Sequence, residues 1–146
     1  MVEVVDDAPL EEVKTLLREY PDSIPIVLEA VDYERWLAAL PGEYTLLLAR
    51  VDGENAGCVC FPRFEDGIGE IKRMYVREQF RRAGVGRALV AAAIEHARAA
   101  GYTCIRLDTH STMAPPQNLY RSFGFVEIPR YWDHPIPGVV FFELVL

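Results

Sequence analysis

The amino-acid sequence lacks the features that mark exported, membrane-bound and metal-binding proteins. The first residues are acidic, where a secretory signal would be basic. The longest purely apolar run of the best predicted helix, residues 88–94, is far too short to cross a bilayer. The three cysteines are an odd number, and the three histidines show no ligand spacing. We therefore expect a cytoplasmic protein with reduced thiols, no metal and no membrane partner.

An overall basic charge is also missing. The net charge of −7 argues against nucleic acid as a partner. The charge is uneven: residues 1–70 carry −11, residues 71–100 carry +5, and residues 101–146 carry −1. A basic island in an acidic chain points to a local polyanion such as a phosphorylated cofactor, or to a solvated arginine-rich turn. The length of 146 residues and a 51% hydrophobic content fit a single domain over residues 1–146.

Hydrophobic periodicity and turn residues predict an α/β (mixed α+β) fold. The predicted strands are residues 2–5, 44–51, 56–64, 69–76, 103–109, 125–128 and 139–145, and the predicted helices are residues 7–20, 26–40, 85–100 and 117–123. Strands joined by tight turns pair antiparallel, whereas the strand–helix–strand step from 69 to 109 should be parallel and right-handed. We expect a mixed, mostly antiparallel sheet with helices on both faces.

The most informative stretch joins the strand at 69–76 to the alanine-rich helix. The first N–H groups of a helix lack internal partners and carry the positive end of its dipole. Gly84 and Gly86 have no Cβ, so an anion can approach that backbone closely. The surrounding arginines complete what looks like a diphosphate cradle. No Gly-Lys-Ser/Thr follows, which excludes a P-loop, and Leu89 stands where a dinucleotide fingerprint needs glycine.

Two motifs carry a family resemblance. Arg81-x-x-Gly84-x-Gly86 resembles the coenzyme A loop of the GNAT superfamily of N-acetyltransferases, and the segment from Leu119-Tyr120 to Gly124-Phe125 resembles a second GNAT segment. With residues 70–76 and the tail from residue 129, the resemblance covers about the last two thirds of the chain. It implies a GNAT fold and acetyl-CoA as co-substrate. The residues that it implies for binding acetyl-CoA are Met74, Tyr75, Val76, Arg81, Arg82, Ala83, Gly84, Val85, Gly86 and Arg87.

The resemblance also implies a reaction, in which a primary amine of a small molecule or peptide attacks acetyl-CoA directly in a ternary complex. Tyr120 is then the acid that protonates the leaving thiolate, with a packing role as its alternative. Glu70 is the candidate base, with a surface pair with Lys72 as its alternative and water chains as a substitute. Strand alternation predicts that Glu70, Lys72, Met74 and Val76 share one face.

The chain departs from the family pattern in one segment. Met113 and Pro116 occupy positions where many members have Asn and Ala. That departure leaves open a non-catalytic acyl-CoA-binding module that acts as a sensor or scaffold. His110 fits a loop histidine or an acceptor contact, and the loop around Tyr131, Trp132 and His134 fits an acceptor pocket or a dimer contact. We expect a monomer or a homodimer.

Overall fold

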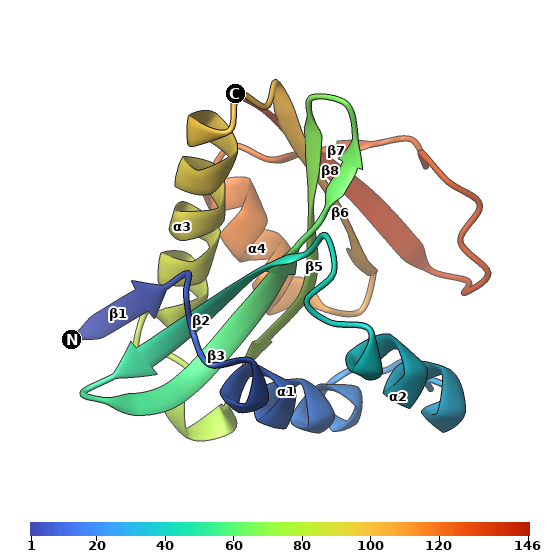
Figure 1. Ribbon diagram of the computed structural model, residues 1–146. Coiled ribbons are helices and arrows are strands. Elements are labelled where there is room, and N and C mark those ends of the chain that lie inside the picture. Colours follow the sequence, from blue (N-terminus) through green and yellow to red (C-terminus); the bar gives the residue numbers. More distant parts are fainter.

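The computed structural model describes all 146 residues as one mixed sheet with helices on both sides (Figure 1). The helices are α1 (Leu10–Glu19), α2 (Ala30–Ala38), α3 (Val85–Ala99) and α4 (Ala114–Ser122), with short 3₁₀ turns η1 (Tyr20–Ser23) and η2 (Glu78–Phe80). The strands are β1 (Val2–Val5), β2 (Thr45–Val51), β3 (Glu54–Phe61), β4 (Arg63–Glu65), β5 (Ile68–Val76), β6 (Cys104–His110), β7 (Val126–Ile128) and β8 (Val139–Val145). Their order is β1-β2-β3-β5-β6-β8-β7, and β4 pairs with β5. None of the helices has both the length and the apolar content that a membrane span requires.

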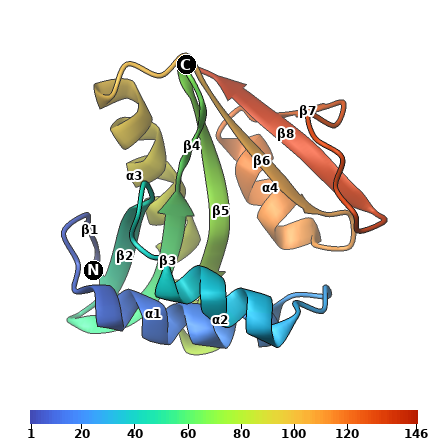
Figure 2. The ribbon, with the colours of Figure 1, turned by 45° about the vertical axis from the view of Figure 1, so that its right-hand side comes forward.

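The two faces of the sheet bury separate clusters of apolar side chains, which confirms the prediction of helices on both faces. Alternation along β2 sends Leu47 and Ala49 toward α3 and α4, and sends Leu48 toward α1 and α2. The two helical layers lie on opposite sides of the sheet in Figure 2. Three free cysteines are buried, and burial raises the pKa of the Cys60 thiol to about 12.

The predicted order of elements is confirmed, and several boundaries differ. The first helix begins at Leu10 rather than at residue 7, and the fourth begins at Ala114 rather than at residue 117. The second helix begins at Ala30 rather than at residue 26, because the Glu29 carboxylate accepts hydrogen bonds from the N–H groups of Val31 and Asp32 and so caps it. The strand predicted over 56–64 is divided at Pro62, which has no N–H to donate to a ladder.

The two central strands diverge along their length. β5 and β6 are parallel, as predicted, and they pair only from Ile68–Ile71 against Cys104–Leu107. Beyond that point β6 continues to pair with β8 up to His110, while β5 continues to pair with β3 up to Val76. The carboxyl-terminal halves of β5 and β6 therefore have unpaired edges that face each other across an opening.

A β-bulge in β5 overturns the predicted grouping of its side chains. Cys60 pairs with Lys72 and Cys58 with Tyr75, so β5 has one extra residue between these pairs. Arg73 adopts a φ of +56° there, in the left-handed region. Strict alternation fails at the bulge, so Lys72 and Tyr75 share the α1/α2 face, while Met74 and Val76 pack toward α3. Glu70 and Lys72 still share a face, but Met74 and Val76 do not share it with them.

Candidate active site

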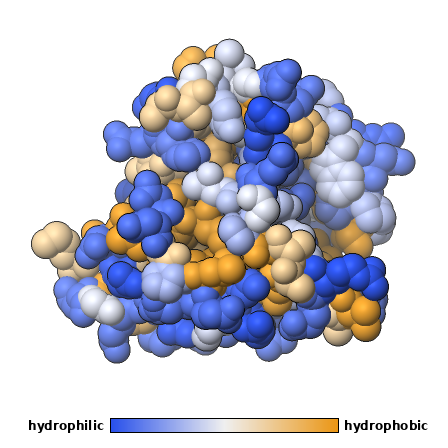
Figure 3. All heavy atoms as spheres, in the orientation of Figure 1, coloured by the Kyte–Doolittle hydropathy of each residue, from blue (hydrophilic) through white to orange (hydrophobic).

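A cleft of about 1100 Å³ occupies the opening between β5 and β6. It runs from the start of α3 to the segment that connects α1 and α2, and both diverging strands line it. The face of the molecule seen in Figure 3 shows apolar side chains gathered near its middle and bordered by hydrophilic ones. One continuous space therefore connects a basic helix terminus with an aromatic wall.

The first end of the cleft is the exposed turn that begins α3. Gly84 has a φ of +83°, a conformation that side-chain-bearing residues rarely adopt, and provides no side-chain cap. No acidic residue stands in the first turn of α3. The unpaired N–H groups and the positive end of the helix dipole are thus open to an anion. In α2, by contrast, the Glu29 carboxylate accepts hydrogen bonds from the first N–H groups.

Two arginines of this turn are oriented by neighbouring elements. Arg81 donates from Nε to the carbonyl of Val76 at 3.2 Å, which ties the turn to the end of β5. Arg87 donates to the Ser122 hydroxyl at 3.0 Å, and its guanidinium lies 5.1 Å from the centre of the Phe123 ring. Both side chains line the cleft, together with Arg82. The predicted loop residues Arg81, Arg82, Gly84, Val85, Gly86 and Arg87, and the strand residues Met74, Tyr75 and Val76, all line this one space. Ala83 is exposed on the same turn but does not line it.

Tyr120 lies in the wall between the two ends of the cleft. It comes from α4, is only 6% exposed, and packs against Phe125 at 5.7 Å between ring centres. Its hydroxyl makes no hydrogen bond within the protein and is not fully buried, because the one buried side-chain nitrogen or oxygen without a partner is Arg73 Nε. The hydroxyl is therefore open to the cleft that the residue lines. Burial raises the pKa of Tyr120, so the hydroxyl stays protonated through the neutral range.

Glu70 lies outside the lining of the cleft. Its side chain is buried, accepts a 2.7 Å hydrogen bond from the Tyr131 hydroxyl, and approaches the Lys72 ammonium at 3.5 Å. Lys72 itself lines the cleft. Burial, with the charge of Glu70 as a smaller cause, raises the pKa of Tyr131, which keeps that hydroxyl protonated as a donor. Glu70 is thus separated from the cleft that Tyr120 lines by the Lys72 side chain.

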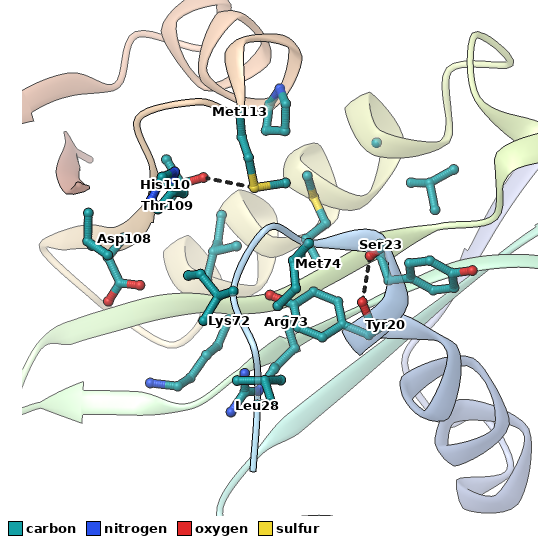
Figure 4. Close-up of a pocket in the computed structure, with 18 of the residues that line it drawn as sticks. Tyr20, Ser23, Leu28, Lys72, Arg73, Met74, Asp108, Thr109, His110 and Met113 are labelled. Atoms are coloured by element: carbon teal, nitrogen blue, oxygen red, sulfur yellow. Dashed lines mark hydrogen bonds between the residues drawn. The ribbon is translucent and has the colours of Figure 1, made fainter. Parts of the chain in front are cut away.

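The second end of the cleft is made by segments far apart in the sequence. Tyr20, Tyr33 and Trp36 from η1 and α2 form one wall. Asp108 stands at the opposite wall, where its carboxylate accepts a 3.0 Å hydrogen bond from the Trp132 indole. Figure 4 shows Lys72, Arg73 and Met74 projecting from β5 between these walls, with Asp108, Thr109 and His110 on the other side. No cysteine lines the cleft.

Comparison with known proteins identifies this arrangement. A sequence model described as the acetyltransferase (GNAT) family matches residues 10–125. The chain belongs to the GNAT family of acetyltransferases. An uncharacterized N-acetyltransferase of Schizosaccharomyces pombe is 34% identical over 142 residues, covering 92% of this chain and 87% of the relative.

Two further comparisons concern more distant proteins. An N-acetylaspartate synthetase of Danio rerio is 29% identical over 104 residues, which cover 71% of this chain and 33% of the synthetase. The solved structure of yncA from Salmonella typhimurium with its cofactor acetyl-CoA superimposes with a TM-score of 0.76 at 19% identity, covering 99% of this chain and 93% of that one. The fold, the use of acetyl-CoA and acyltransferase activity are thus those of the GNAT family.

The residues present fit acetyl-CoA. The uncapped α3 terminus, flanked by Arg82 and Arg87, suits the diphosphate, since anions bind where backbone N–H groups converge with a helix dipole. The unpaired edge of β5 beyond Ile71 offers backbone groups to an amide-containing arm.

Sequence reasoning missed most of the aromatic wall. Tyr33 and Trp36 are three residues apart and share one side of α2, which is a pattern typical of ordinary core packing. Asp108 and Arg73 gave no signal, because their roles depend on the splay of β6 and on the bulge in β5. His110, Trp132 and His134 line the cleft. Tyr131 does not line it and instead donates a hydrogen bond to Glu70.

Proposed function

We propose that this protein is an acetyl-CoA-dependent N-acetyltransferase that transfers an acetyl group directly to a primary amine of a small molecule. One observation carries the proposal. A single cleft of about 1100 Å³ is lined by the α3 turn, by the free edge of β5, by Tyr120 and by the aromatic wall, so it has room for two substrates. A donor and an acceptor can therefore lie in contact, and proximity supplies much of the rate.

The reaction forms one bond and breaks another. The amine nitrogen bonds to the thioester carbonyl carbon, the carbon–sulfur bond breaks, and the electron pair leaves on sulfur. The nitrogen loses one proton and the thiolate gains one, so the products are an N-acetylated amine and coenzyme A. Direct attack agrees with the absence of a cysteine from the cleft lining and with the raised pKa values of the buried thiols.

Tyr120 supplies the proton for the leaving thiolate. Its hydroxyl is open to the cleft, makes no hydrogen bond within the protein and stays protonated, so it can donate to a bound ligand. A packing residue would bury the ring equally well. The accessible, unpaired hydroxyl supports the catalytic role, because it can donate to a group bound in the cleft.

Glu70 accepts the proton of the amine through water. The carboxylate is one side chain behind Lys72 and is held by Tyr131, so it reaches the cleft by relay rather than by contact. Asp108 is the competing candidate, since its carboxylate lines the cleft and lies 4.0 Å from the His134 imidazole. Paired substitutions at the two positions separate these alternatives.

A screen of acetyl transfer to amine classes, with coenzyme A release and product mass as readouts, tests the proposed function. The relative named N-acetylaspartate synthetase supports including amino acids in the screen. We expect stoichiometric coenzyme A and acetylated amine with wild-type protein, and slower formation of both with Tyr120→Phe. Tight binding of acetyl-CoA without transfer to any amine would instead establish the alternative function, a non-catalytic acyl-CoA-binding module.

A further inference from the structure

The guanidinium of Arg73 stands in the acceptor end of the cleft without an anionic partner. It lies 4.9 Å from the centre of the Trp36 ring, 5.3 Å from that of Tyr33 and 5.7 Å from that of Tyr20. Its Nε is buried and has no hydrogen-bond partner, and no carboxylate approaches within ion-pair distance. Figure 4 shows Arg73 and Tyr20 side by side at this end.

The other charged side chains near this end are already occupied. Lys72 pairs with Glu70, and Asp108 is held by the Trp132 indole. On the facing helix, Glu29 caps the first turn, and Asp32 pairs with Arg35 at 3.4 Å. Lys72 has a carboxylate partner and Arg73 has none, so Arg73 is the cation at the acceptor end that remains without an ion pair. Three aromatic side chains offset part of the cost of desolvating it, but its Nε–H group has no acceptor.

The backbone holds Arg73 in this place at a cost. A φ of +56° is unfavourable for a residue with a Cβ, and such conformations persist where the surrounding structure enforces them. The bulge turns Arg73 toward the aromatic wall and Met74, its neighbour in the chain, toward the opposite face. A group bound to the guanidinium would consequently lie next to the unpaired edge of β5, which offers backbone groups to the amide-containing arm of acetyl-CoA.

We propose that Arg73 binds the carboxylate of the acceptor, so that the substrates are free amino acids or closely related amino-carboxylates. A planar guanidinium with free N–H groups matches a carboxylate in both geometry and charge. The three rings around it exclude water, which strengthens that pair. The inference rests on the proposed acetyltransferase function and excludes protein N-termini and lysine side chains as preferred acceptors, because those amines lack an adjacent carboxylate.

The test compares matched acceptors on wild-type protein and Arg73→Gln. Leucine and phenylalanine are each paired with their amides and with isoamylamine or phenethylamine, and a peptide with a free N-terminus is added. We expect wild-type protein to prefer the amino acids. Arg73→Gln should lower kcat/KM for them by about tenfold to a hundredfold, mainly through KM, as expected for loss of a charged hydrogen bond, with little change for the neutral amines.

Two controls keep the test decisive. Arg121→Gln removes an arginine that lies over the Phe142 ring at 5.0 Å and does not line the cleft, so it reports the effect of losing such a stacked cation from the fold. Arg73→Lys keeps the charge and should recover part of the preference for carboxylates. Equal losses for amino acids and neutral amines in Arg73→Gln, or a wild-type preference for amides or the peptide, would overturn the inference.

Thermal shifts separate failure of this inference from failure of the proposed function. The acceptor pairs are added to protein saturated with coenzyme A, so that no transfer is needed. If no amine is acetylated but amino acids stabilise the wild type and not Arg73→Gln, the carboxylate site stands and the acetyltransferase proposal fails. If amines are acetylated and the stabilisation by amino acids does not depend on Arg73, the acetyltransferase proposal stands and the carboxylate site at Arg73 fails.

Discussion

The two ends of the cleft are built on opposite principles. The cofactor end is one continuous stretch, residues 81–87, that is exposed and supplies backbone N–H groups from an uncapped helix. The acceptor end is assembled from η1, α2, the bulge in β5 and the end of β6, and it supplies side chains packed behind one another. A polyphosphate can be recognised by local backbone geometry, whereas a small acceptor needs a pocket with walls on several sides.

The two ends should therefore control two different properties, the affinity for acetyl-CoA and the choice of acceptor. Substitutions at the cofactor end should change acetyl-CoA affinity without affecting the choice of acceptor. Substitutions at the acceptor end should change which amine reacts and leave acetyl-CoA affinity intact. Tyr120, in the wall between the two ends, and Glu70, behind Lys72, should affect the rate for every acceptor.

The largest effect is expected from Tyr120→Phe, which tests the residue between the two ends. The ring stays packed against Phe125 while the proton donor is lost, so kcat should fall by roughly ten- to a thousandfold with every acceptor. The fall in kcat should be smaller for thioesters with a better leaving group. Tyr102→Phe, on a ring stacked with Phe61 away from the cleft, is the control. Wild-type turnover of both thioesters by Tyr120→Phe would make Tyr120 a packing residue.

A smaller effect is expected from Glu70→Gln. If Glu70 takes the amine proton through water, kcat should fall by about tenfold to a hundredfold, and the acidic limb of the pH–rate profile should disappear. Asp108→Asn is the matched comparison and should retain that limb. The opposite pattern, with the limb lost only in Asp108→Asn, would transfer the role of base to Asp108.

Arg87→Gln sharpens the separation of the two ends. Removing the guanidinium that Ser122 orients should raise the dissociation constant of acetyl-CoA by about tenfold, as expected for one charged hydrogen bond. Arg98→Gln, on the same helix but outside the cleft, should leave it unchanged. Relative kcat/KM values among acceptors should not move in either variant. A change in acceptor preference would show that the ends are coupled.

The smallest effect concerns the contact that ties α1 to the end of β5. Hydrogen bonds from Arg77, and secondarily from Tyr75, hold the pKa of Glu19 below its ordinary value of 4.5. The stabilisation is therefore complete above pH 4.5 and disappears as the pH falls through the lower folded-state value. Glu19→Gln should lower the free energy of unfolding by about 0.5–1 kcal/mol at pH 7, because the Glu19–Arg77 pair is partly exposed. The loss should be smaller in acid. Urea unfolding with Glu11→Gln as control measures it.

The same contrast explains how much the sequence could predict. The element order, the two helical layers and the cofactor turn follow from local patterns of hydrophobicity, glycine and arginine, which need no knowledge of distant segments. The acceptor end could not be predicted, because it depends on the extra residue in β5. Strand alternation placed Met74 and Val76 with Glu70, and the bulge at Arg73 separates them. The splay of β6, which brings Asp108 to the cleft, likewise has no signature in its own residues.

The backbone at the start of α3 is the part of the protein that we propose holds acetyl-CoA. Gly84 and Gly101 provide a matched test at the two ends of that helix, since each has positive φ and open space around it. Valine at either position should destabilise the fold by a similar amount, about 1–2 kcal/mol. Calorimetric titration with acetyl-CoA should show affinity kept in Gly101→Val and lowered at least about tenfold, some 1.4 kcal/mol, in Gly84→Val. Equal affinity in the two variants would contradict the claim.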